Sequence, residues 1–337
     1  MDFEMPVMDG ITAVKHIMAN RKVPIIMFSS LTYEGAKVTL DALAAGALDF
    51  IPKDFAEVSR NSAALKKKLH ERLITLARAG QPGPAPVVNS STPKSSSTVT
   101  TSATAAATSL LASTTSSMAS HTTLRSSAPL GTTQKPAAVT PVETYRLKRQ
   151  PKLLVVGAST GGPVALTEVL MALPANFPIP IVLVQHMPEN FTKAFAERLN
   201  KQCNVRVREA VDGDLLEPGL ALLAPGGKQL MLDKRNGGSV RILPDDDRVN
   251  YKPSLDITFG SAANCYADKV LGVVLTGMGS DGCKGAELLK STGSQLWSQD
   301  EASCVIYGMP MAVARAGLTD RVLSLKDIGP RLAREVV

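Results

Sequence analysis

Residues 153–163 read LLVVGASTGGP, an apolar run that ends at Ser159, a serine set among glycines and followed by Pro163. A short run rich in Val and Leu and stopped by glycine is typical of a strand buried in a parallel sheet. The pattern G-x-S-x-G between a strand and a helix is typical of a turn that exposes a nucleophilic serine. Because proline suits the first turn of a helix, the stretch predicts strand, turn and helix, with Ser159 at the sheet edge.

The same turn has two simpler interpretations: a glycine-rich turn that binds nothing, or one that holds a phosphate. Its spacing fits neither G-x-G-x-x-G nor the phosphate-binding loop with its lysine. Backbone N–H groups at the start of the next helix, such as that of Thr160, lack helical partners and are available to stabilise an oxyanion. Ser159 is therefore our candidate nucleophile.

Two further apolar runs end in reactive side chains. Residues 179–185 (IPIVLVQ) lead into His186, and residues 269–280 (KVLGVVLTGMGS) lead into Asp281. The carboxyl ends of parallel strands meet at one edge of an open α/β sheet, where ligands bind. We therefore expect a hydroxyl, an imidazole and a carboxylate at one edge, which are the groups of a serine hydrolase.

The assignment of the base depends on elimination among four histidines. His16 falls in a predicted N-terminal helix, His70 in a basic helix, and His121 in a low-complexity stretch. A lone histidine at a strand end is more often structural than reactive. Once Ser159 is taken as a nucleophile, however, His186 is the one histidine that follows a buried strand in the same domain, which makes it the candidate base.

Asp281 is the candidate acid, because it follows a strong apolar run within the glycine-rich loop TGMGSDG. A buried carboxylate there would fix the tautomer of His186. The alternatives lie in predicted turns or on a predicted helix: Asp212, Asp214, Asp245, Asp246, Asp247 and Asp256. The order Ser, His, Asp differs from the order in α/β-hydrolases, so the serine motif does not imply that fold.

The bulk composition is that of a globular protein, with 337 residues, 44% hydrophobic and 20% charged. The length allows two domains. No run of about 18 apolar residues exists and the acidic N-terminus is not a secretory signal, so we expect a cytoplasmic protein without membrane insertion. The net charge of +7 is dispersed and aromatic residues make up 4%, which disfavours nucleic-acid binding. The four widely spaced cysteines indicate reduced thiols rather than disulfides or a metal site.

A composition shift divides the chain into three segments. Residues 91–120 contain 18 Ser or Thr and a single charged residue, Lys94. Such a stretch has too few large apolar side chains to offset the entropy of ordering. We therefore predict an N-terminal piece over 1–79, a flexible linker over 80–150, and a C-terminal domain over 151–337.

Both outer segments alternate predicted strands and helices, which indicates α/β architecture with a mostly parallel, doubly wound sheet. In the N-terminal piece the strands are expected at 23–29 and 47–52, and the helices at 10–19, 34–45 and 55–78. In the C-terminal domain the strands are expected at 153–158, 179–185, 205–209, 220–224, 240–243 and 269–276, and the helices at 163–172, 190–202, 253–266 and 282–292. Asn-Gly-Gly within 229–243 predicts an antiparallel hairpin.

The C-terminal domain resembles the chemotaxis protein-glutamate methylesterases. The resemblance spans about residues 152–335 and is carried, in order, by VVGASTGGP, VQHMPENFTKAFAERLN, APGGKQL, VLTGMGSDG and QDEASCVIYGMP. It implies a Rossmann-like esterase that releases methanol from glutamate methyl esters of methyl-accepting chemotaxis receptors and can also deamidate receptor glutamines. It implies Ser159 as nucleophile, His186 as base and Asp281 as orienting acid. The backbone amides of Thr160 and Met278 would form the oxyanion hole, and catalysis would need no cofactor.

The N-terminal piece resembles the second half of a flavodoxin-like response-regulator receiver of two-component signalling. DFEMPVMDG places Asp2 at the phospho-acceptor position, IIMFS places Ser29 at the hydroxyl position, and DFIPKD places Lys53 at the phosphate-contacting position. In an intact receiver, a chemotaxis histidine kinase would be the phosphodonor and Mg²⁺ the counter-ion. In the intact family, the unphosphorylated receiver is thought to cover the active site.

The sequence departs from the receiver pattern before Asp2. The strand that would carry an acidic pair for Mg²⁺, and the helix and strand after it, do not precede Met1. A central strand would then be missing and the divalent ion would lack its main ligands. We therefore expect that the chain as given is not phosphorylated normally, and that a fragment or a misassigned start explains it best.

Two other functions stay open at this point. One is a non-enzymatic regulatory module that binds receptors or a nucleotide, although no acidic ribose ligand is evident near residue 180. The other is an esterase domain, acting as a monomer, that the N-terminal piece either still inhibits or no longer inhibits.

Overall fold

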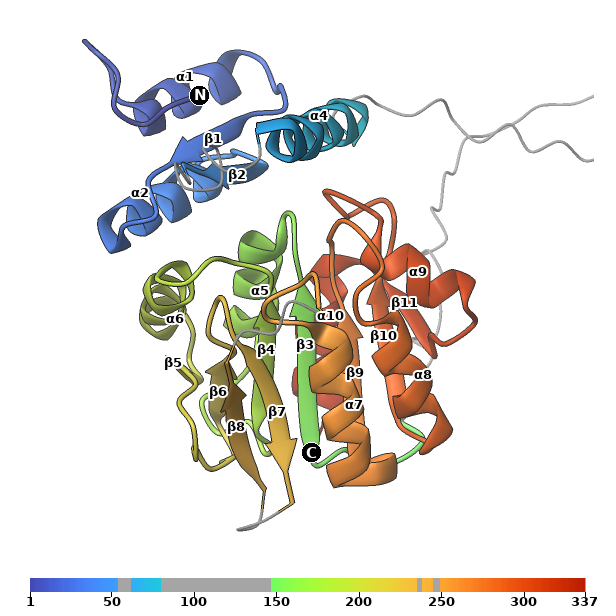
Figure 1. Cartoon of the computed structure of the whole chain (residues 1–337). Coiled ribbons are helices and arrows are strands. Elements are labelled where there is room, and N and C mark those ends of the chain that lie inside the picture. The colour runs from blue at the N-terminus through green and yellow to red at the C-terminus, as the bar shows by residue number, and fades with distance from the viewer. Residues whose placement is uncertain (54–61, 80–146, 235–237, 245–248, 337) are drawn as a thin grey trace, which may run out of the picture. The chain divides into compact units, whose positions relative to one another are not determined.

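The computed structural model describes most of the chain (Figure 1). The described residues are 1–53, 62–79, 147–234, 238–244 and 249–336. The predicted linker over 80–150 therefore lies outside the described residues, apart from 147–150. The same is true of the acidic residues 245–247 and of the Asn236–Gly237 turn. The division into three segments stays a prediction.

The core of the C-terminal domain is a seven-stranded sheet with strand order β11-β10-β9-β3-β4-β6-β5. Every neighbouring pair in it is parallel. The strands are β3 (Leu153–Ala158), β4 (Ile181–Gln185), β5 (Arg206–Glu209), β6 (Leu220–Leu223), β9 (Val270–Val274), β10 (Gln295–Gln299) and β11 (Arg321–Leu323). The three strands that precede the candidate residues, β9, β3 and β4, are neighbours with β3 in the middle.

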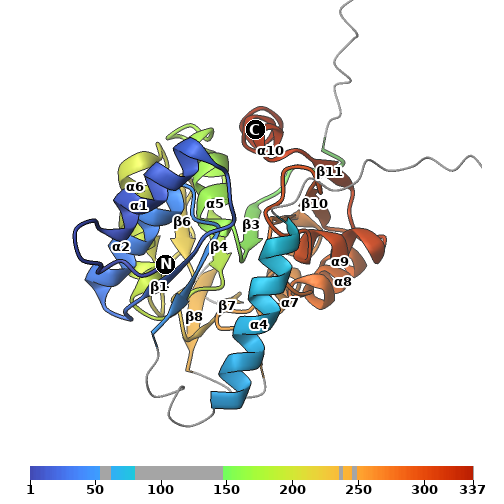
Figure 2. The same ribbon diagram turned by 90° about the horizontal axis from the view of Figure 1, so that it is seen from above.

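Helices cover both faces of this sheet (Figure 2). One face is covered by α5 (Gly162–Met171), α6 (Phe191–Gln202) and α10 (Leu325–Glu335), and the other by α7 (Leu255–Tyr266), α8 (Cys283–Ser291) and α9 (Met309–Arg315). A short 3₁₀ turn, η2 (Ala267–Lys269), joins α7 to β9. The predicted doubly wound, mostly parallel α/β class is confirmed.

The position of β3 in the middle of the sheet explains why the run of residues before Ser159 is apolar throughout. Successive side chains of a strand point to opposite faces. Leu154 and Val156 pack into the hydrophobic cluster that contains α5 and α6, whereas Leu153 and Val155 pack into the cluster of α7 and α8. All six residues of β3 are buried. A strand covered on both faces has no polar side, which produces the continuous apolar run.

An antiparallel hairpin stands beside the main sheet. Its strands are β7 (Gln229–Asp233) and β8 (Ser239–Leu243), paired in register from Gln229–Leu243 to Asp233–Ser239. The hairpin predicted over 229–243 is thus confirmed in its strands. It packs against α7, which leads toward the candidate site.

The described residues of the N-terminal piece, 1–53 and 62–79, form two parallel strands and three helices. They are α1 (Gly10–Asn20), β1 (Ile26–Ser29), α2 (Tyr33–Ala44), β2 (Asp49–Pro52) and α4 (Ser62–Ala79). β1 and β2 form a two-stranded sheet, and Asp2 adds an isolated parallel bridge to Phe28 of β1. The alternation of strands and helices predicted for this piece is confirmed.

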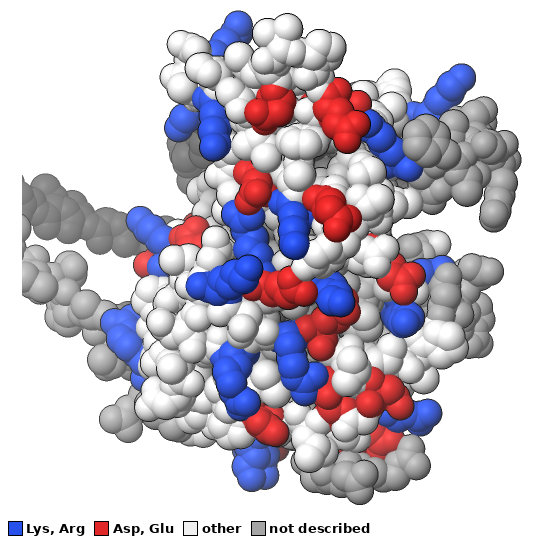
Figure 3. Space-filling model, turned by 90° about the vertical axis from the view of Figure 1, so that its left-hand side faces the viewer, with Lys and Arg blue, Asp and Glu red and all other residues white. Residues whose placement is uncertain are grey.

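Two surface observations bear on the predicted partners. On the face shown in Figure 3, the described Lys and Arg side chains lie among Asp and Glu rather than in a patch of one sign. That face carries no basic stripe of the kind that marks a nucleic-acid site. Within the described part of the chain, no helix is both long and apolar enough to cross a membrane.

Candidate active site

Ser159 lies directly after β3, in a turn that only small residues can form. Its backbone N–H donates to the Thr276 carbonyl oxygen at 3.0 Å, and the Gly162 N–H donates back to the Ser159 carbonyl at 2.8 Å. Gly161 has φ of 77°, a left-handed conformation that favours glycine. A Cβ on Gly162 would collide with the side chain of Gln185. The glycines of the motif therefore allow the tight exit from the sheet that the sequence predicts.

His186 lies directly after β4, the neighbour of β3. The strand register pairs Ala158 with Gln185, so Ser159 and His186 leave the sheet side by side. The buried amide of Gln185 donates to the Ser159 carbonyl at 2.9 Å and to the His186 carbonyl at 3.1 Å. One side chain thus ties together the backbones of both predicted residues.

Asp281 reaches the site by a longer path than the sequence suggested. The strand expected over 269–276 ends at Val274, so Asp281 follows a loop rather than the strand end. The reason is that the chain leaves the sheet early: the Gly277 N–H donates to the Ile306 carbonyl at 3.0 Å, outside the sheet. Gly279 and Gly282, with φ of 92° and 94°, then bend the loop back toward His186.

The carboxylate of Asp281 is buried and fully engaged. Its Oδ2 lies 2.7 Å from His186 Nε2 and accepts from the Leu255 N–H at 2.6 Å. Its Oδ1 accepts from the Ser254 hydroxyl at 2.8 Å. Burial alone would raise the pKa of Asp281, but the hydrogen bonds and the charge of His186 hold that pKa below its ordinary value. Asp281 is therefore an anion hydrogen-bonded to the imidazole of His186.

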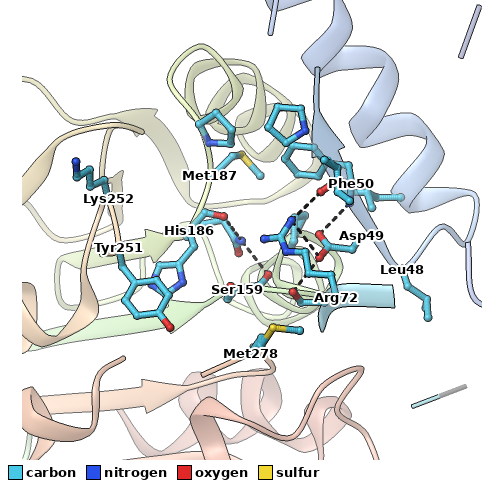
Figure 4. Close-up of a pocket in the computed structure, with 18 of the residues that line it drawn as sticks. Leu48, Asp49, Phe50, Arg72, Ser159, His186, Met187, Tyr251, Lys252 and Met278 are labelled. Atoms are coloured by element: carbon cyan, nitrogen blue, oxygen red, sulfur yellow. Dashed lines mark hydrogen bonds and ion pairs between the residues drawn. The ribbon is translucent and has the colours of Figure 1, made fainter. Parts of the chain in front are cut away.

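The other ring nitrogen of His186 is the one available for chemistry. Nδ1 is buried and has no hydrogen-bond partner among the described residues. Likewise, no hydrogen bond within the described chain engages the Ser159 hydroxyl. Such bonds are often long in unliganded sites and tighten when substrate binds. Above the ring, Tyr251 stacks on His186 with centroids 4.5 Å apart and planes inclined by 16° (Figure 4).

These residues line one cavity of about 650 Å³, a volume ordinary for a ligand pocket. Thr160 and Met278 also line it. No hydrogen bond among the described residues uses the backbone N–H of either. Both N–H groups are thus unengaged at the pocket that holds Ser159, as an oxyanion hole requires.

Residues of the N-terminal piece close the opposite wall of this pocket (Figure 4). Asp49 is buried and accepts from the Thr160 hydroxyl at 3.0 Å. Phe50 stacks on Phe191 of α6, with centroids 4.7 Å apart and planes within 2°. Arg72 of α4 donates to the Phe50 carbonyl at 3.1 Å and lies 3.9 Å from the Asp49 carboxylate. Burial raises the pKa of Asp49, and Arg72 only partly offsets this effect.

The predicted phospho-acceptor residues are only partly brought together. Lys53 Nζ donates to both oxygens of Asp2, at 2.8 and 2.7 Å, and this hydrogen bond lowers the pKa of Asp2. Ser29 is engaged elsewhere: its hydroxyl donates to the Gly35 carbonyl at 3.1 Å and accepts from Thr39. The acceptor role of Asp2 stays a prediction.

No metal site is evident in the part of the chain that the structure describes, since no three His, Cys, Asp or Glu side chains there could hold an ion. The described cysteines are free thiols. Burial raises the pKa of Cys203 to about 11 and that of Cys304 to about 12, so both are neutral at pH 7. Cysteine binds metals as the thiolate, so these two residues are poor ligands.

Four residues at the site were not identified from the sequence: Asp49, Gln185, Tyr251 and Ser254. Gln185 had a weak signal, since it is a polar residue at the end of an otherwise apolar strand. The other three carry none. Tyr251 lies in a segment without periodicity, Ser254 lies in the first turn of the helix predicted over 253–266, and Asp49 belongs to a different part of the chain.

Comparison with known proteins agrees with the geometry. The CheB methylesterase family model matches residues 154–332, and the response regulator receiver domain model matches residues 1–64. The crystal structure of the Thermotoga maritima CheB methylesterase catalytic domain is similar, with a TM-score of 0.53 and 41% identity, covering 55% of this chain and 99% of that one.

Curated relatives match along the whole chain. Protein-glutamate methylesterase/protein-glutamine glutaminase 1 of Saccharophagus degradans is 53% identical over 337 residues, which is 100% of this chain and 86% of that protein. Protein-glutamate methylesterase/protein-glutamine glutaminase 3 of Pseudomonas syringae pv. syringae is 60% identical over 333 residues, which is 98% of this chain and 85% of that protein. Both family resemblances seen in the sequence are confirmed, and the chain belongs to the CheB methylesterase family.

Proposed function

We propose that this protein hydrolyses glutamate methyl esters on methyl-accepting chemotaxis receptors and releases methanol, with Ser159 as nucleophile. Membership in the methylesterase family makes the chain a hydrolase, as the sequence predicted. The observation that carries the residue assignment is the 2.7 Å bond between His186 Nε2 and Asp281, beside Ser159 in one pocket. A binding module without catalysis would not need an ionised carboxylate bonded to a histidine that shares a pocket with a half-buried serine.

In the first half of the reaction, Ser159 Oγ attacks the ester carbonyl carbon. Nδ1 of His186 takes the hydroxyl proton, because Nε2 is engaged by Asp281. The carbonyl oxygen becomes an oxyanion, which the N–H groups of Thr160 and Met278 stabilise. The C–O bond to the methoxy group then breaks, the imidazolium returns its proton to that oxygen, and methanol leaves an acyl-enzyme on Ser159.

In the second half, water replaces the serine. His186 takes a proton from the water as its oxygen bonds to the acyl carbon. The bond to Ser159 Oγ then breaks, and the serine recovers the proton from His186. The products are a receptor glutamate and free enzyme, and no cofactor takes part in any step.

A second reaction, deamidation of receptor glutamines, uses the same groups. The names of the relatives include protein-glutamine glutaminase. A glutamine side chain presents the same carbonyl to Ser159. His186 would then protonate the departing amide nitrogen as the C–N bond breaks, so that ammonia leaves instead of methanol. One acyl-enzyme thus serves both reactions.

The proposed function is tested by incubating the purified chain with receptor whose glutamates carry labelled methyl groups. We expect labelled methanol to appear and the methyl groups to disappear from the receptor at equal rates. Unmethylated receptor, with glutamines at the same positions, should release ammonia. Absence of both products at micromolar enzyme would overturn the assignment.

We further propose that residues 1–79 restrict substrate access to Ser159. Asp49 and Phe50 contact Thr160 and Phe191, and Leu76 of α4 is buried in an apolar cluster with Ile306 of the esterase domain. The chemotaxis histidine kinase as phosphodonor, with Mg²⁺ at an intact receiver, would relieve this restriction. While the restriction holds, a substrate can enter only when the contact opens. The observed rate is therefore proportional to the fraction of molecules in which the contact is open.

Replacing Leu76 with aspartate should raise the methanol-release rate at low substrate about tenfold. A carboxylate buried in the apolar cluster destabilises the closed contact by several kcal/mol. The matched control is Leu73→Asp on the same helix, where the side chain is 48% exposed and should tolerate the charge. Equal rates for wild type, Leu76→Asp and Leu73→Asp would show that residues 1–79 do not restrict the site.

A further inference from the structure

Tyr251 covers one face of the His186 ring. The ring centroids are 4.5 Å apart and the planes are inclined by 16°, which is a stacked arrangement. Figure 4 shows the two rings face to face at the pocket wall. The tyrosine is half-buried and comes from the segment between the hairpin and α7, far in sequence from all three residues of the proposed reaction.

The segment that carries Tyr251 is held at both ends. The buried amide of Gln229 donates to the Tyr251 carbonyl at 2.7 Å and accepts from the Ser254 N–H at 2.8 Å. The next residue, Leu255, donates its N–H to Asp281 at 2.6 Å. The stacked ring and the carboxylate that orients His186 are therefore fixed by one short piece of backbone.

The loop that carries Asp281 leaves room for the tyrosine. A Cβ on Gly279 would collide with the Tyr251 hydroxyl, and Gly279 has φ of 92°, which also favours glycine. The tyrosine is thus packed between the imidazole and the loop. Burial, and then the charges of Asp281 and Asp256, raise the pKa of Tyr251, so the ring is a neutral phenol at pH 7.

We propose that Tyr251 is a positioning residue for the esterase reaction, holding the His186 ring so that Nε2 meets Asp281 while Nδ1 faces Ser159. Two effects combine. The stacked Tyr251 ring blocks rotation of the imidazole out of the plane that lies nearly parallel to the tyrosine ring. Its π face also attracts the positive charge that His186 acquires when it takes the serine proton. This inference rests on the proposed function, because it assigns His186 as the base.

The test compares aromatic and non-aromatic replacements of Tyr251 in the intact chain. Tyr251→Leu and Tyr251→Met, which lose the ring, should lower kcat for methanol release about tenfold while KM changes less than about twofold. Tyr251→Phe, which keeps the ring, should stay within about threefold of wild type. Tyr266→Leu removes another half-buried tyrosine of the same domain, away from His186, and should leave kcat unchanged.

A spectroscopic readout separates positioning from general stability. The ring protons of His186, identified by their absence in His186→Gln, should show an upfield ring-current shift in wild type and in Tyr251→Phe. That shift should be lost in the Leu and Met variants. Full kcat in both non-aromatic variants, or a Phe variant as slow as they are, would overturn the proposal. If wild type itself releases no methanol, the proposed function fails, whereas the ring-current shift still reports on the stack.

Discussion

Replacing Ser159 with alanine is expected to lower kcat for methanol release by about 10⁵- to 10⁶-fold. Loss of the nucleophile in a serine hydrolase removes the acyl-enzyme route altogether, and only the oxyanion site and binding remain to accelerate direct attack by water. The backbone of Ser159 bonds to Thr276 and Gly162 through its N–H and carbonyl groups, which alanine retains. The variant should therefore fold normally and bind receptor with unchanged affinity.

The measurement is single-turnover release of labelled methanol, because a steady-state assay would not resolve so slow a rate. Ser291→Ala serves as the control, since Ser291 is an exposed serine on α8 whose hydroxyl bonds only to the nearby Leu288 carbonyl. A serine-reactive fluorophosphonate should label wild type and Ser291→Ala but not Ser159→Ala. Unchanged methanol release by Ser159→Ala would remove this serine from the mechanism.

Replacing Asp281 with asparagine is expected to lower kcat by about 10⁴-fold with little change in KM. The carboxylate accepts hydrogen bonds from His186 Nε2, the Leu255 N–H and the Ser254 hydroxyl. An amide has one oxygen and one NH₂ group, so it cannot accept all three bonds. If its NH₂ group faces His186, it selects the tautomer that carries the proton on Nδ1, which then cannot take the proton of Ser159.

The matched control for this prediction is Asp256→Asn. Asp256 is a neighbouring carboxylate that accepts from the Gly285 N–H at 2.7 Å, and no hydrogen bond among the described residues joins its side chain to His186. Its backbone N–H donates to Asp281 at 3.2 Å, a bond that asparagine retains. We expect its kcat to stay within about tenfold of wild type. Methanol release by Asp281→Asn at the rate of Asp256→Asn would exclude Asp281 as the orienting acid.

The Asp281 variant should also differ from wild type in how its stability depends on pH. The pKa of Asp281 in the folded protein lies below its ordinary value, so the carboxylate stabilises the fold above that ordinary value. This contribution is lost as pH falls through the lowered folded pKa. The difference in free energy of unfolding between wild type and Asp281→Asn should therefore shrink on acidification, which denaturant titrations at several pH values would measure.

The sequence by itself determined the local structure around Ser159 and His186. Both follow strands buried on two faces, and such strands produce continuous apolar runs that can be recognised without a structure. The glycines after β3 and the proline after them specify a tight turn into a helix for equally local reasons. By contrast, the elements that follow residue 292, which are β10, β11, α9 and α10, were not predicted from the sequence.

Only the tertiary structure decided how these residues work together. Asp281 meets His186 across 95 residues of sequence, and the loop that brings it there begins where β9 ends earlier than its apolar run. Tertiary packing between segments that share no motif brings Nε2 of His186 to Asp281, leaves Nδ1 without a partner among the described residues, and stacks Tyr251 on the ring. Periodicity and turn residues depend on interactions between residues that are close together in the sequence. The contacts of Asp281, Tyr251 and Asp49 are long-range, so sheet order and packing alone determine them.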